Sequence, residues 1–131
     1  MTVNTSVTQI KCNHKRFFYY WLQFTMPLHK LKNKDMLILS YILKKRHELS
    51  RIITDDSAID KFLFSRDIRE QIMEENNLKR IELQQTLTEL RKANILSEDN
   101  QLNKRIIPKI STNGKKFDLM IIFNIEEDDI K

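Results

Sequence analysis

The sequence predicts an α+β fold in which three helices precede a β-hairpin. Apolar residues recur every three or four positions, as on a helix with a buried face, in three stretches: residues 34–49, 65–77 and 79–93. Two later stretches, 95–110 and 117–125, are rich in isoleucine, leucine and phenylalanine and favour strands. Between them, Asn113-Gly114 is a strong hairpin signal because both residues tolerate positive φ. At 131 residues, the chain suits one domain with one core.

The first predicted helix, 34–49, has a suitable N-cap in Asn33, and Asp35 favours the positive end of its dipole. Its apolar residues occupy most of the circumference, so we expect burial on more than one face. The following residues, 51–63, are expected to form a connection, with a short strand at 61–64.

The second and third predicted helices are separated by a short asparagine-rich turn. Ser65 is a good N-cap for the second helix, and Asn76-Asn77 ends it. In the third helix, Asn94 can adopt the left-handed conformation that ends many helices. Its inward face is expected to carry Ile81 or Leu83, followed by two further leucines: Leu87 and Leu90.

An aromatic run at residues 17–24 holds six of the eleven aromatic residues of the chain. Aromatic enrichment and Pro27 favour a strand here, preceded by a polar arm. On a strand, Phe17, Tyr19 and Trp21 would share one face, and the opposite face would also be apolar. Three interpretations of this run stay open. One face of the strand could form a protein–protein contact, or the strand could be fully buried at the centre of a sheet. The aromatic rings could also stack on single-stranded nucleic acid.

Charge is distributed unevenly along the chain. Residues 1–53 hold ten basic and two acidic residues, residues 54–125 hold twelve of each, and residues 126–131 have a net charge of −3, for a total of +5. A basic N-terminal end and an acidic C-terminal end favour head-to-tail association, which can close into a ring. Besides the three aromatic residues above, the predicted protein interface therefore comprises Lys15, Arg16, Glu126, Glu127, Asp128 and Asp129.

The stretch "QQTLTELRKANIL" resembles the end of the recognition helix in winged helix-turn-helix proteins, where the chain passes directly into the first wing strand. The resemblance covers a winged-helix domain at residues 33–125. The predicted N-terminal arm and aromatic strand (1–32) precede it, and the acidic tail (126–131) follows it. In DNA-binding members, the third helix enters the major groove. The residues then implied to contact duplex DNA are Lys79, Arg80, Gln84, Gln85, Thr88, Arg91, Lys115 and Lys116. The balanced charge of residues 54–125 argues against this alternative, since DNA binding needs surplus positive charge.

A second resemblance involves the whole chain. The segments "FFYYWLQFTMPLHKLKNKDMLIL", "NKRIIPKI" and "FDLMIIFNI" are similar to a small ring subunit of the head–tail connector, or tail barrel, of crAss-like bacteriophages. This implies a virion structural protein, assembled in the host cytoplasm, whose partners are copies of itself in a ring and neighbouring virion proteins. The alternative is a cytoplasmic DNA-binding module of a transcription regulator or replication initiator; an adaptor that recruits another protein is a third reading.

Residues with catalytic chemistry are sparse. Gly114 is the only glycine, so neither a phosphate-binding loop nor a dinucleotide fingerprint can be built. Cys12 and His14 are close in sequence, but two ligands do not make a zinc site. We therefore expect a non-enzyme without metal, cofactor or small-molecule substrate. A lone cysteine excludes an internal disulfide, and no apolar run approaches the roughly 20 residues that span a membrane.

Overall fold

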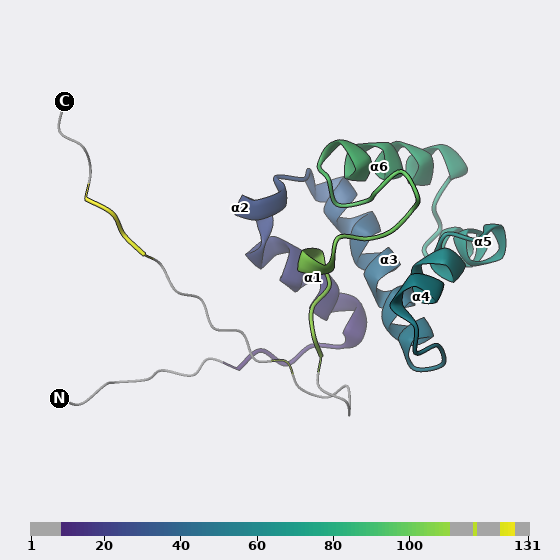
Figure 1. The fold of residues 1–131 in the computed structure, drawn as a ribbon, viewed down its shortest axis with the longest axis horizontal. Coiled ribbons are helices and arrows are strands. Elements are labelled where there is room, and N and C mark those ends of the chain that lie inside the picture. The colour runs from purple at the N-terminus through teal and green to yellow at the C-terminus, as the bar shows by residue number, and fades with distance from the viewer. Residues whose placement is uncertain (1–8, 111–116, 118–123, 128–131) are drawn as a thin grey trace.

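The structure is a computed structural model that describes residues 9–110, 117 and 124–127. Its elements are α1 (His14–Phe24), α2 (Met26–His29), α3 (Asn33–Ser50), α4 (Asp56–Leu63), α5 (Arg66–Glu75), α6 (Arg80–Lys92) and the 3₁₀ turn η1 (Lys104–Ile106). Helix α3 is central and contacts α1, α4, α5 and α6 (Figure 1). Helices α1 and α2 lie on one side of it, and α4 and α5 lie on the other.

The predicted α+β class with a hairpin wing is wrong for the part of the chain that the structure describes, because that part is helical and contains no strand. Between α6 and residue 110, strand pairing is limited to one isolated antiparallel bridge between Leu96 and Leu102. It stops there because Asn103 accepts the backbone N–H of Arg105 at 3.0 Å, which turns the chain into η1. The predicted hairpin turn at 113–114 lies outside the described residues.

The predicted aromatic strand is also wrong, because residues 17–24 belong to α1. The side chain of Asn13 caps this helix by accepting the backbone N–H of Arg16 at 2.9 Å. Helical spacing places Phe18 and Leu22 against α3 with 2% and 0% of their surface exposed. This burial outweighs the weaker preference of aromatic residues for strands, which depends strongly on context.

Residues 56–63 form α4, so the predicted connection and the short strand at 61–64 are wrong. Asp55 occupies the N-cap position, although its side chain makes no capping hydrogen bond. Ile59 and Leu63 are four residues apart and are both buried, as a helix packed against α3 requires.

The three predicted helices are confirmed as α3, α5 and α6. Ser65 caps α5 by accepting the N–H of Ile68 at 3.4 Å. Asn33, in contrast, is the first residue of α3, and Lys32 occupies the N-cap position without a side-chain hydrogen bond. The expected left-handed conformation at Asn94 is present, with φ of 60°.

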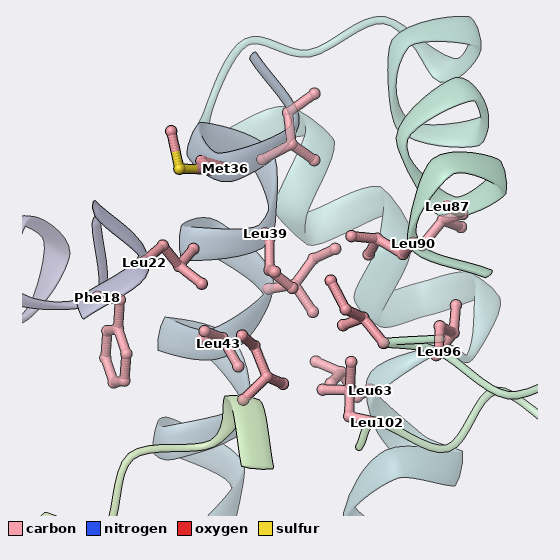
Figure 2. Close-up of a cluster of buried hydrophobic side chains, with 14 of the residues drawn as sticks. Phe18, Leu22, Met36, Leu39, Leu43, Leu63, Leu87, Leu90, Leu96 and Leu102 are labelled. Carbon is pink, nitrogen blue, oxygen red and sulfur yellow. The ribbon is translucent and has the colours of Figure 1, made fainter. Parts of the chain in front are cut away.

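The hydrophobic core is one cluster built around α3. Figure 2 shows side chains from four helices and the bridge after α6 meeting there: Phe18, Leu22, Met36, Leu39, Leu43, Leu63, Leu87, Leu90, Leu96 and Leu102. Ile81 is 60% exposed, so the inward face of α6 begins with Leu83. The core holds α1 and α3 together, and it thereby fixes the surface between them.

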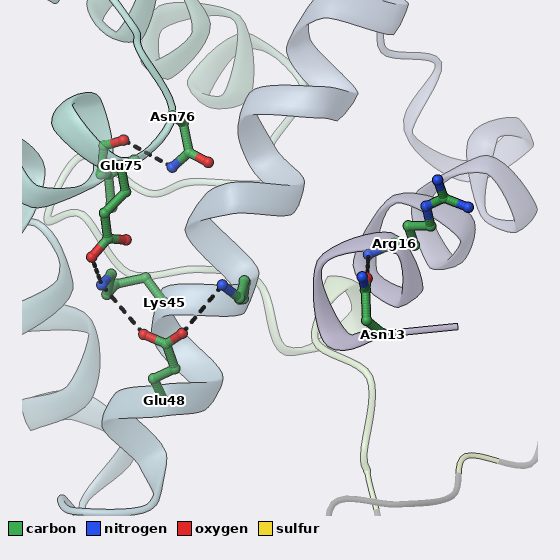
Figure 3. A network of polar contacts seen from close by, with 8 residues as sticks. Asn13, Arg16, Lys45, Glu48, Glu75 and Asn76 are labelled. Carbon is green, nitrogen blue, oxygen red and sulfur yellow. Dashed lines mark hydrogen bonds and ion pairs between the residues drawn. The ribbon is translucent and has the colours of Figure 1, made fainter. Parts of the chain in front are cut away.

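Polar contacts attach α3 to its neighbours. At the N-terminal end of α3, the buried Asp35 accepts the hydroxyl of Thr86 from α6 at 2.7 Å. Further along, Lys45 contacts Glu75 of α5 at 3.0 Å and Glu48 at 3.3 Å (Figure 3). Burial alone would lower the pKa of Lys45, but these two carboxylates outweigh burial and raise it above 10.5.

Candidate protein-interaction site between α1 and α3

All three tyrosines of the chain line one groove between α1 and α3, with a volume of about 540 Å³. We call it the tyrosine groove. Its lining consists of Asn13, Lys15, Arg16, Tyr19, Tyr20 and Gln23 from α1 and its cap, with Leu37, Ser40 and Tyr41 from α3. The groove follows from helical spacing, because residues three or four positions apart lie on the same side of α1.

The tyrosine groove combines apolar walls with accessible polar groups. Tyr19, Tyr20 and Tyr41 are half-buried, and Leu37 is 41% exposed. Among the described residues, no hydrogen bond engages any of the three tyrosine hydroxyls. The hydroxyls are therefore available to a partner, while the rings offer it apolar surface.

Positive charge surrounds this groove. The ammonium group of Lys15 lies 5.4 Å from the centroid of the Tyr41 ring, a cation–π arrangement. Within the described ranges, neither Lys15 nor Arg16 forms an ion pair. Residues 14–50 contain eight basic residues and two acidic ones. Four of these basic residues pair with carboxylates, namely Lys34, Lys44, Lys45 and Arg46. Lys15 and Arg16 therefore supply the positive charge that the groove offers to a partner.

Two of the predicted interface residues lie outside this groove. Phe17 and Trp21 lie on another side of α1, where their ring centroids are 5.1 Å and 5.5 Å from that of Phe117. The indole N–H of Trp21 donates to the carbonyl of Ile106 at 2.7 Å. The prediction that Phe17, Tyr19 and Trp21 share a face is therefore wrong, because it assumed a strand. Of these three, Tyr19 lines the groove.

The acidic C-terminal segment is only partly described. Glu126 and Glu127 are exposed, and Ile125 before them is 92% exposed. Asp128 and Asp129, which the prediction also included, lie outside the described residues. The visible part therefore offers two carboxylates and a large apolar side chain to solvent.

The residues predicted to contact DNA are exposed on or next to α6: Lys79, Arg80, Gln84, Gln85, Thr88 and Arg91. Arg91 already donates to Asn100 at 2.8 Å, and the hydroxyl of Thr88 donates to the carbonyl of Gln84. Lys115 and Lys116 lie outside the described residues. Residues 66–92 hold six basic and six acidic residues, so this surface lacks the positive surplus found around the tyrosine groove.

Glu82, at the start of α6, illustrates how acidic residues occupy that surface. Its carboxylate accepts the backbone N–H of Lys79 at 3.1 Å and pairs with Lys34 at 3.2 Å. These two contacts, the backbone hydrogen bond first, lower the pKa of Glu82. An anionic side chain is thus held at the helix end that would otherwise attract phosphate.

Sequence reasoning missed six of the nine residues that line the groove: Asn13, Tyr20, Gln23, Leu37, Ser40 and Tyr41. A strand puts Tyr20 on the face opposite Tyr19, and the apolar pattern of residues 34–49 does not show which neighbour Tyr41 faces. Asn13 could have predicted α1 from the sequence, because a good N-cap immediately before the basic and aromatic run favours a helix. Helical spacing from Asn13 groups Arg16 with Tyr20 and Lys15 with Tyr19.

His29 and His47 contact groups within the fold. His29 is buried, and its ring lies between the carbonyl of Leu22, 2.7 Å from Nε2, and the N–H of Leu31, 3.0 Å from Nδ1. A neutral ring with its proton on Nε2 satisfies both contacts. His47 stacks on His14 at 5.2 Å; burial, followed by the charge of His14, lowers the pKa of His47.

Within residues 9–110, 117 and 124–127, the structure shows neither a metal site nor a membrane-spanning helix. No group of three histidine, cysteine, aspartate or glutamate side chains lies close enough there to hold a metal ion. The helices described there are also too short or too polar to cross a lipid bilayer. Comparison with protein-family models, with curated proteins and with solved structures found no match.

Proposed function

We propose that this protein is a non-catalytic structural subunit that binds other protein chains through the tyrosine groove. The resemblance to ring subunits of crAss-like phages supplies the setting, a ring in the head–tail connector or tail barrel of a virion. The supporting observation is that three tyrosines, the exposed Leu37 and two cations without carboxylate partners meet in one open groove of the described structure.

The composition of the groove is that of an energetically important contact. Tyrosine and arginine are enriched among the residues that dominate binding energy at protein interfaces. Tyrosine also presents a large rigid surface at low entropic cost, because it has only two rotatable side-chain bonds. Here these side chains sit on two helices fixed by the core, so little ordering is needed when a partner binds.

A double substitution of Tyr20→Ala with Leu37→Ala tests this proposal. Both side chains line the groove and are absent from the buried core, so we expect the variant to fold normally. Sedimentation velocity over a concentration series should show self-association of the wild-type protein, weakened by about tenfold or more in the variant, as for the loss of one binding hot spot. Equal mass distributions for both proteins at every concentration would contradict the proposal.

The matched control is Ile52→Ala with Phe62→Ala. These apolar side chains are 83% and 57% exposed but lie outside the groove. If this control weakens association as strongly as the groove variant, general surface hydrophobicity and not the groove drives assembly.

A second candidate function, binding of duplex DNA, is favoured by one observation at α5 and α6. A cleft of about 300 Å³ between these helices is lined by residues that include Arg66, Arg69, Arg80 and Gln84. The Nε of Arg69 is buried, and no described residue accepts a hydrogen bond from it. Binding of a mixed-sequence duplex at two salt concentrations, with Arg80→Ala for comparison, tests this candidate. Absence of affinity at low salt would remove it.

A further inference from the structure

We infer that the tyrosine groove of one copy receives the acidic C-terminal segment, residues 124–131, of a second copy. This inference rests on the proposed function and names the partner of the same site. One molecule carries both an open groove and an exposed segment of complementary chemistry. Two different surfaces that fit each other on identical chains produce head-to-tail association, which closes into a ring if the rotation permits.

Charge complementarity is the first argument. The groove presents Lys15 and Arg16 without ion-pair partners among the described residues. The C-terminal segment presents the exposed carboxylates of Glu126 and Glu127, and its sequence continues with two aspartates. Lys15 and Arg16 would meet a segment of net charge −3, and opposite charges of this kind both attract and orient partners.

Apolar complementarity is the second argument. Ile125 precedes the carboxylates and is 92% exposed, and Ile130 follows them in the sequence. The groove offers the exposed Leu37 and three half-buried tyrosine side chains as apolar surface. A purely acidic peptide would leave these rings exposed, whereas an isoleucine beside the carboxylates can cover them.

Length is the third argument. The groove extends along α1 from Asn13 to Gln23. At a rise of about 1.5 Å per residue, this part of the helix measures about 15 Å. An extended chain advances about 3.3 Å per residue, so the groove accommodates about four or five residues. That length matches residues 125–129, which contain the first isoleucine and all four carboxylates.

The test uses charge reversal in the full-length protein. The groove variant is Lys15→Glu with Arg16→Glu, and the tail variant is Glu126→Lys with Glu127→Lys. We expect sedimentation velocity to show self-association weakened by tenfold or more in each variant alone. An equimolar mixture of the two variants should recover association, because unaltered grooves then meet unaltered tails and reversed grooves meet reversed tails.

The control is Lys61→Glu with Lys104→Glu. Both lysines are exposed and lie outside the groove, and the change in net charge equals that of the groove variant. This control should keep the wild-type association. Circular dichroism of every variant verifies that the helices are intact.

Contrary outcomes have distinct meanings. If each variant is weakened but the mixture does not recover, the groove and the segment do not contact each other between copies, and the inference is wrong. If the tail variant associates like the wild type while Tyr20→Ala with Leu37→Ala does not, another partner occupies the groove; the inference fails and the proposed function stands. If the Tyr20/Leu37 variant also matches the wild type, both fail.

Discussion

At the scale of single residues, Asp60 joins three segments of the chain. One carboxylate oxygen accepts the Nε–H of Arg46 at 2.8 Å, and the other accepts the backbone N–H of Leu102 at 2.9 Å. The side chains of Arg46 and Asp60 are 9% and 4% exposed, so the charges are largely removed from water. Removing one partner of a buried pair leaves the other uncompensated, which costs more than the intact pair contributes.

We therefore expect Asp60→Ala to lower the free energy of unfolding by about 3–5 kcal/mol. Asp56→Ala is the matched control, because Asp56 contacts the same Arg46 at 3.6 Å but is 65% exposed. An exposed pair contributes about 1 kcal/mol or less. Urea denaturation followed by circular dichroism measures both values, and equal losses in the two variants would contradict the assigned role of burial.

His47 predicts a pH dependence of stability. Its pKa is lowered from 6.5 in the folded state, first by burial and then by the charges of His14 and Arg51, against the opposing effect of Glu48. The unfolded chain therefore binds a proton at higher pH than the folded chain does. The contribution of His47 to the free energy of unfolding is therefore full above about pH 6.5, and it is lost as the pH falls toward the lowered pKa.

The measurement is urea denaturation at pH 7.5 and pH 5, two values on either side of about 6.5. The wild-type protein should lose more stability between them than His47→Gln, which cannot be protonated at this position. The same pH dependence in both proteins would assign the effect to other groups.

At the scale of elements, α1 shows why a helix can escape sequence reasoning. Its aromatic residues individually favour strands, and only its position against α3 decides between the two structures. The helix is stabilised by Phe18 and Leu22 in the core and by the Trp21 hydrogen bond to Ile106. The same packing directs Tyr19 and Tyr20 into the groove, so the candidate site depends on the helical state of α1.

We expect Leu22→Ala to destabilise the protein by about 2–5 kcal/mol, since its side chain is fully buried between α1 and α3. Phe24→Ala, at a position that is 54% exposed on the same helix, should change stability by about 0.5 kcal/mol or less. Thermal unfolding monitored by circular dichroism distinguishes them. A small loss for Leu22→Ala would mean that α1 contributes little to the core.

Prediction from sequence succeeded where local signals and burial agreed. Helix α5 has its cap at Ser65, a clear apolar spacing and an asparagine at its end. Asn94, two residues after the last residue of α6, has the expected left-handed conformation. It failed for α1 and α4, whose short apolar patterns also fit strands or loops. For the site, Lys15, Arg16 and Tyr19 were found from charge and aromatic content, but Tyr41 could not be, because its proximity to α1 is a property of the tertiary structure.

At the scale of the whole molecule, the uneven charge of the chain is distributed over different helices. The surplus of positive charge lies on α1 to α3, residues 66–92 are balanced, and the negative segment is at the C-terminal end. Surface charges separated by more than the screening length interact weakly, and added salt shortens that length. Association between these two regions should consequently respond to ionic strength.

We expect self-association to weaken when the salt concentration rises from about 0.1 M to about 1 M, because the Debye length falls from about 10 Å to about 3 Å. Sedimentation velocity of the wild-type protein at both concentrations checks this. The Lys61/Lys104 control should show the same salt response, since its groove and tail are unchanged. Stronger association at high salt would indicate that apolar contacts dominate instead.

Trp21 is the only tryptophan of the chain. Its indole is held by the backbone of Ile106 and by the edge of Phe117, both of which belong to the segment that leads toward the acidic end. The fluorescence emission wavelength of Trp21 is therefore sensitive to detachment of that segment from α1. If binding of residues 124–131 to a second copy moves this segment, the emission of Trp21 reports that movement without an attached dye.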